Sequence, residues 1–152
     1  MTLREQFTAE LKTAMIAKDA PRVGAIRMIT AKLKDADIAA RPKGVDAITD
    51  DEIISMLRGM VKSRKESVEL YLQGNRQDLV DKELAEIAVI EHFLPAQMDD
   101  AAIEAIVTDA IAETGAASVK DMGKVMAALK AKHGAALDMG RVNPLVKQKL
   151  GG

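Results

Sequence analysis

The chain has 152 residues, of which 48% are hydrophobic but only 2% aromatic, and its 22 Lys and Arg nearly balance 23 Asp and Glu. This composition argues against a disordered chain, and the absence of Cys excludes a disulfide framework, a thiolate zinc site and a cysteine nucleophile. The N-terminal residues are charged and lack an apolar core segment, and no apolar run reaches membrane-spanning length. We therefore expect a cytoplasmic protein without a secretory signal and without a membrane partner.

The apolar residues repeat with helical spacing nearly throughout, and no stretch alternates as a strand does, so the sequence predicts an all-α fold. Thr2 and Glu5 form a capping box at the start of a first helix. Pro21 is predicted to open a second helix, because its missing N–H costs nothing there, and this helix ends before the loop at 41–44.

A long third helix is predicted to begin at a second capping box, formed by Thr49 and Glu52, and to extend to Gly74. A fourth helix is expected to start near Asp78 and to end with the first part of the chain. The four helices together predict an N-terminal domain of residues 1–95.

Three shorter helices are predicted to follow, because Pro95 cannot continue the preceding helix and the apolar stripes resume beyond it. Ser118 is expected to cap the middle one of the three. Asn143 and Pro144 are expected to be the cap and the first residue of the last. These helices predict a small three-helix C-terminal domain of residues 96–152.

Three charged residues fall where the helical pattern expects apolar side chains. Arg64 lies in the apolar face of the third helix, and Glu83 and Glu86 lie in that of the fourth. Because an isolated buried charge is very costly, we predict that Arg64 forms a structural ion pair with Glu83 or Glu86. The alternative is a carboxylate metal site, but neither His92 nor His133 follows a Glu by three residues, as helical-bundle metal sites need. We therefore expect no metal and no cofactor.

Basic residues are concentrated in the second helix, on the outer face of the third and after residue 119, whereas many acidic residues lie between 78 and 113. This segregation could present a basic stripe to phosphates, although the same charges also suit solvated helix faces. The nine Met residues leave a choice between an adaptable binding groove and core filling, and their helical spacing favours the core. No glycine-rich phosphate loop and no serine nucleophile motif is present, so we expect no catalytic residue.

Several motifs resemble the GatB/YqeY family, and they follow one another along essentially the whole chain. They are Arg64 to Tyr71 (RKESVELY), Gly74 to Leu79 (GNRQDL), Phe93-Leu94-Pro95, Asp121 to Met126 (DMGKVM) and Val142 to Lys147 (VNPLVK). The chain is most similar to the free-standing YqeY-like proteins. These are related to the C-terminal tail of the B subunit of aspartyl/glutamyl-tRNA amidotransferase, a carbon–nitrogen ligase that uses glutamine as amido donor.

The resemblance implies a two-part helical protein connected with the amidation of misacylated tRNA. In the family the tail is thought to contact tRNA while amidase and kinase chemistry reside elsewhere, so we expect a non-catalytic tRNA-binding module. The expected phosphate contacts are Lys62, Lys65, Arg76, Lys124, Lys130, Lys132, Arg141 and Lys147. Two alternatives are an accessory subunit, associated with the amidotransferase subunits or an aminoacyl-tRNA synthetase, and a protein-interaction module whose partner is not nucleic acid.

Overall fold

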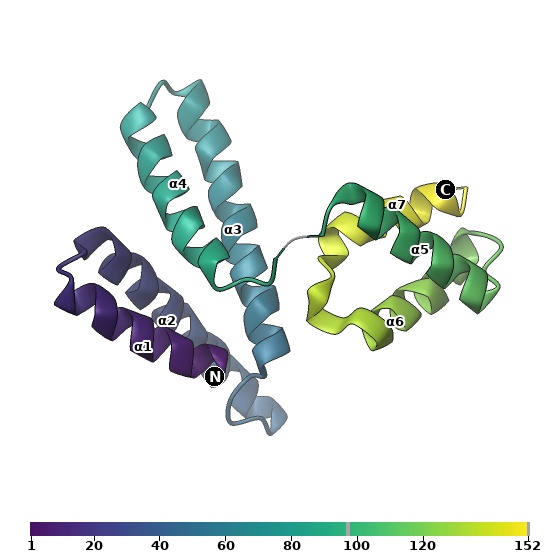
Figure 1. Cartoon of the computed structure of the whole chain (residues 1–152), viewed down its shortest axis with the longest axis horizontal. Coiled ribbons are helices and arrows are strands. Elements are labelled where there is room, and N and C mark those ends of the chain that lie inside the picture. The colour runs from purple at the N-terminus through teal and green to yellow at the C-terminus, as the bar shows by residue number, and fades with distance from the viewer. Residues whose placement is uncertain (97, 152) are drawn as a thin grey trace. The chain divides into compact units, whose positions relative to one another are not determined.

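The computed structural model describes residues 1–96 and 98–151, except for the side chain of Ala135, and this part of the chain contains seven α-helices and no strand (Figure 1). The predicted all-α fold is confirmed. Gln97 and Gly152, which belong to the predicted C-terminal domain, lie outside the described residues. No helix in the described part of the chain combines the length and the apolar character needed to cross a bilayer.

The chain divides into two compact units, Met1–Leu94 and Pro95–Gly152. The N-terminal unit contains α1 (Leu3–Ile16), α2 (Ala20–Ala40), the 3₁₀ turn η1 (Arg41–Lys43), α3 (Asp50–Gln73) and α4 (Gln77–His92). The C-terminal unit contains α5 (Asp100–Thr114), η2 (Val119–Asp121), α6 (Met122–His133), η3 (Gly134–Ala136) and α7 (Met139–Lys149).

The predicted start of α1 is confirmed in detail. The Thr2 hydroxyl accepts a hydrogen bond from the Glu5 N–H, and the Thr2 N–H donates to the Glu5 carboxylate at 2.8 Å. At the start of α3 the Thr49 hydroxyl accepts from the Glu52 N–H at 3.2 Å. The Glu52 carboxylate accepts from the Thr49 hydroxyl rather than from the Thr49 N–H, so the second predicted capping box forms only in part. Helix α2 starts one residue before Pro21, with Asp19 as its cap.

The helices of the N-terminal unit form two antiparallel pairs, α1 with α2 and α3 with α4 (Figure 1). Helix α4 packs extensively against α3 and also against α2, whereas α2 and α3 contact each other over only a short stretch. At the end of α4, Phe93 meets Phe7 of α1 edge to face, with ring centroids 4.9 Å apart. All four helices therefore share one apolar core, and α4 connects the two pairs.

A bidentate ion pair fastens α1 to α2 and to the loop before α3. The Arg4 guanidinium donates to both carboxylate oxygens of Asp37 at 2.8 Å, and also to the Ile48 carbonyl at 3.0 Å. The Ile48 N–H donates to Asp37 at 2.9 Å. The hydrogen bond from Arg4, assisted by that from Ile48, lowers the pKa of Asp37 from 3.8 to about 2.

Two predicted helix starts in the C-terminal unit are wrong. Ser118 makes no capping hydrogen bond, and it precedes the short η2 turn rather than α6, which begins at Met122. The last helix begins at Met139, with Asp138 as the cap that accepts from the Gly140 N–H, so Asn143 and Pro144 lie inside it.

The early start of α7 follows from what the helix buries. Val142, Val146 and Leu150 recur every four residues and are all buried in the core of the C-terminal unit, so the chain must already be helical before Pro144. Proline at this position removes the hydrogen bond to the Gly140 carbonyl, but both residues are exposed, where water can satisfy that carbonyl. The free energy gained by burying the apolar face of α7 exceeds the cost of the hydrogen bond lost at Pro144, so the proline does not mark the start of the helix.

We expect the Asp37 pair to make the N-terminal unit lose stability in acid. Because the folded-state pKa lies below the unfolded value, its contribution is present above about pH 4 and is lost as the pH falls through about 2. At pH 6, Asp37→Asn should lower the free energy of unfolding by about 1–3 kcal/mol, and the difference from the wild type should vanish near pH 2. Thermal unfolding of the wild type and of Asp37→Asn between about pH 2 and pH 6 measures this difference in stability. A stability difference that does not change with pH would contradict the lowered pKa of Asp37.

Candidate nucleic-acid interface

The three charged residues that the sequence places on apolar helix faces lie together between α3 and α4. The Arg64 Nε donates to Glu86 at 3.3 Å and lies 3.9 Å from a carboxylate oxygen of Glu83. The three side chains are between 16% and 21% exposed, so the cluster is half-buried rather than sealed in the core. Arg64 also donates to the Met60 carbonyl of its own helix at 3.2 Å and to the sulfur of Met28 on α2.

The cluster holds one guanidinium against two carboxylates. The Oε2 atom of Glu83 is buried and accepts no hydrogen bond, so Glu83 depends on the nearby charge of Arg64 for its stabilisation. Among the described residues, no group of three or more His, Asp or Glu side chains is placed to hold a metal ion. The geometry here is that of a structural ion pair between neighbouring helices.

Four of the eight predicted phosphate contacts are engaged within the fold. Lys65 lies 3.9 Å from Glu91 on α4, and Arg76 donates to both oxygens of Asp78 at 3.1 and 3.0 Å. The other two lie in the C-terminal unit and connect α5 to the helices that follow. Lys132 of α6 forms an ion pair with Glu113 of α5 at 3.3 Å. Arg141 of α7 forms an ion pair with Asp100 of α5 at 2.6 Å and donates to the Met98 carbonyl at 2.8 Å.

The other four predicted contacts are exposed, and no carboxylate of the described residues forms an ion pair with them within 4 Å. The pKa of Asp121 is lowered first by the hydrogen bonds that it accepts from the backbone, and the charge of Lys124 nevertheless helps to lower it. Lys62 projects from α3 in the N-terminal unit, and Lys124, Lys130 and Lys147 project from α6 and α7 in the C-terminal unit. Exposed lysines without a fixed partner can contact phosphates without first breaking an ion pair. Within the C-terminal unit, α6 and α7 are therefore the best candidates for contact with a polyanion.

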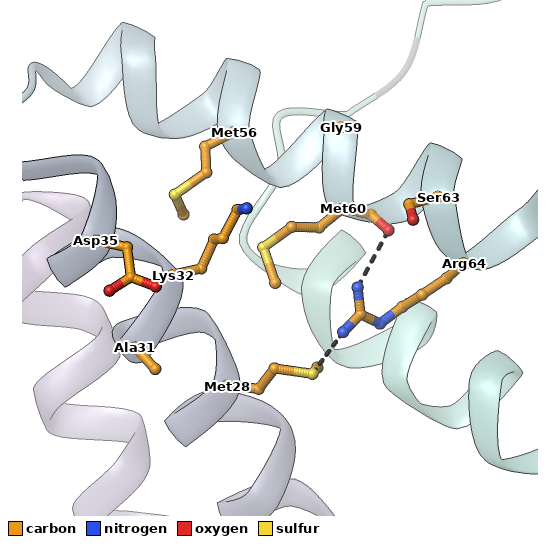
Figure 2. Close-up of a pocket in the computed structure, with 9 residues that line it drawn as sticks. All are labelled: Met28, Ala31, Lys32, Asp35, Met56, Gly59, Met60, Ser63 and Arg64. Atoms are coloured by element: carbon orange, nitrogen blue, oxygen red, sulfur yellow. Dashed lines mark hydrogen bonds between the residues drawn. The ribbon is translucent and has the colours of Figure 1, made fainter. Parts of the chain in front are cut away.

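The methionines of the N-terminal unit serve both the core and a groove. Met60 is buried in the core, whereas Met28 and Met56 are only partly buried and line an open groove between α2 and α3 (Figure 2). Lys32 lines the same groove and is not one of the predicted site residues. The sequence did indicate that Lys32 lies beside Met28, because the two residues are one helical turn apart on a face of α2 outside its apolar stripe.

Comparison with known proteins gives a consistent family assignment. The family model described as "Yqey-like protein" matches residues 4–150. "Altered inheritance of mitochondria protein 41, mitochondrial" of Pyrenophora tritici-repentis is 31% identical over 152 residues, which cover 96% of this chain and 80% of that protein. The proteins of the same name from Lachancea thermotolerans and Saccharomyces cerevisiae are 39% and 34% identical over 85 residues. In both of these the match spans 56% of this chain and 44% of the relative, which is less than half of its length.

The names of these relatives contradict the cytoplasmic location that we expected, because each is called a mitochondrial protein. The expectation rested on the lack of an apolar secretory segment. That feature argues only against secretion, since mitochondrial targeting segments are amphipathic and rich in Arg rather than continuously apolar.

We expect Arg64→Met to destabilise the N-terminal unit, because it leaves two half-buried carboxylates without a counter-charge. The expected loss is about 2 kcal/mol, or a fall of about 10 °C in the melting temperature measured by circular dichroism. Adding Glu83→Gln and Glu86→Gln should restore most of it, and Arg27→Met, at an exposed position on α2, should change little. An unchanged melting temperature for Arg64→Met would show that Arg64 is free to bind a phosphate.

Proposed function

The chain belongs to the YqeY-like family, and from this premise we propose that it is a non-catalytic helical module that binds the phosphate backbone of tRNA. The observation that carries the proposal is the set of exposed lysines of α6 and α7 that the fold leaves without ion pairs, Lys124, Lys130 and Lys147. The resemblance of the motifs to the tail of the amidotransferase B subunit, which is thought to contact tRNA, supports the choice of RNA.

The distribution of charge in the C-terminal unit supports phosphate contact despite an overall charge of −1. Acidic residues of α5 neutralise Lys132, Arg141 and Lys149, the last through Glu104 at 3.1 Å. Each of these pairs connects α5 to α6 or α7, so the acidic charge is used to hold the helices together. The basic residues of this unit that form no ion pair among the described residues are Lys120 of η2, Lys124 and Lys130 of α6, and Lys147 of α7.

The aromatic residues favour contact with the backbone over stacking with bases. Phe7 and Phe93 are buried against each other in the N-terminal core, and Tyr71 is partly buried. A protein that stacks bases needs exposed aromatic faces. Recognition by this chain would therefore depend on phosphates and on RNA shape, with a strong dependence on salt. An accessory role in the amidotransferase reaction rests on the resemblance alone.

Filter binding to bulk tRNA at two salt concentrations tests the proposal. We expect binding at about 50 mM salt that weakens by at least tenfold at about 200 mM. Replacing Lys124, Lys130 and Lys147 together by Gln should weaken binding at low salt by more than tenfold. It should also reduce the slope of log K against log salt concentration by about three, because about three fewer counterions are released.

The matched control replaces three exposed or half-exposed lysines that already have carboxylate partners, Lys65, Lys132 and Lys149, by Gln. This variant loses the same charge and should keep most of the affinity. No binding at low salt would refute the proposal, and equal losses in the two triple variants would show that net charge, rather than these positions, determines binding.

A further inference from the structure

An open groove of about 630 Å³ lies between α2 and α3 of the N-terminal unit (Figure 2). It exists because these two helices pack mainly on their neighbours and contact each other only briefly. Three thioethers form its apolar lining, Met28 from α2 and Met56 and Met60 from consecutive turns of α3. Methionine side chains adapt to partner surfaces of different shape and are enriched in the centres of protein interfaces.

Two cations extend into the same groove. In Figure 2 the ammonium of Lys32 reaches from α2 toward Met56 and Met60, and no described residue forms an ion pair with it. The Nη2 atom of Arg64 donates to the sulfur of Met28, which is a weak acceptor. Asp35 also lines the groove, but its carboxylate points away from the Lys32 ammonium in Figure 2. Arg64 is already held by Glu83 and Glu86, so Lys32 is the cation that can bind a carboxylate brought in by a partner.

A glycine in the interior of α3 forms part of the groove wall. A Cβ atom built on Gly59 would meet nothing within 4 Å, so packing within the chain does not require glycine at this position. Alanine stabilises a helix interior more than glycine does. What glycine provides is an uncovered stretch of backbone that a second helix can approach closely.

We propose that this groove is a docking site for an amphipathic helix of a partner protein. The apolar face of the partner helix packs on Met28, Met56 and Met60, and an acidic residue beside that face binds Lys32. The lining extends about 12 Å along α3, from Met56 to Arg64, which is a little over two helical turns. That length suits a helix with apolar residues at positions i, i+4 and i+7. RNA fits this lining less well, because thioethers offer phosphates no hydrogen bond.

The test uses two helical peptides of roughly 15 residues, with the same leucines at i, i+4 and i+7 and with either Glu or Lys beside them. Binding to the full chain is followed by NMR of ¹³C-methyl-labelled Met. The Glu peptide should shift the methyl signals of Met28, Met56 and Met60 and leave those of Met122 and Met126, in the C-terminal unit, unchanged. The Lys peptide should bind about tenfold more weakly, and Lys32→Glu should reverse this preference.

A substitution in the groove wall separates binding from stability. Gly59→Ala should raise the melting temperature by about 4 °C and weaken binding of the Glu peptide by about tenfold. Gly24→Ala, on α2 outside the groove and equally free of steric contacts, is the matched control, which should raise the melting temperature without weakening binding.

Several results would overturn the docking site. The first is equal affinity for the two peptides, and the second is a peptide-induced shift of methyl signals outside the groove. The third is unchanged peptide binding by Gly59→Ala. The fourth is a shift of the groove methyl signals when tRNA is added or when the chain self-associates. Lys32 is not among the proposed tRNA contacts, so tRNA binding by Lys32→Glu in the filter assay should equal that of the wild type. Failure of the docking site is therefore distinguishable from failure of the proposed function.

Discussion

Burial of one face of α4 against both α2 and α3 is the constraint on which the N-terminal unit depends. Ile90 is fully buried in that face and Ile87 is 5% exposed, and each such side chain contributes about 1.5–3 kcal/mol. The same face carries Glu83 and Glu86, and Arg64 of α3 lies against both where they enter the interface. Because α2 and α3 both pack on α4, they have little surface left for each other, and the Met-lined groove is the consequence.

Carboxylates hold helices together in both units, and this use decides which basic residues are available for other contacts. Asp37 binds Arg4 between the first two helices, and acidic residues of α5 bind Lys132, Arg141 and Lys149. A basic residue paired in this way must give up its partner before it can bind a phosphate. A count of the basic residues in the sequence is therefore larger than the number that can bind a phosphate without breaking an ion pair.

Local signals predicted the helices and failed at two of their starts. The capping box at Thr2 depends on two residues three positions apart, and the structure contains it as predicted. Ser118 and Pro144 carry equally familiar signals, but the chain forms a 3₁₀ turn after the first and continues a helix through the second. At Pro144 the burial of Val142 on the preceding turn outweighs the lost backbone hydrogen bond.

The sequence by itself determined the all-α fold and the apolar faces on which Arg64, Glu83 and Glu86 lie, because helical periodicity is a property of neighbouring residues. Only the tertiary structure decided that Arg4 binds Asp37, 33 positions away, that Lys130 is unpaired while Lys132 is not, and that Lys32 and Gly59 face one groove. These features depend on which helices approach one another in space. The spacing of residues along a single helix carries no information about the distance to another helix.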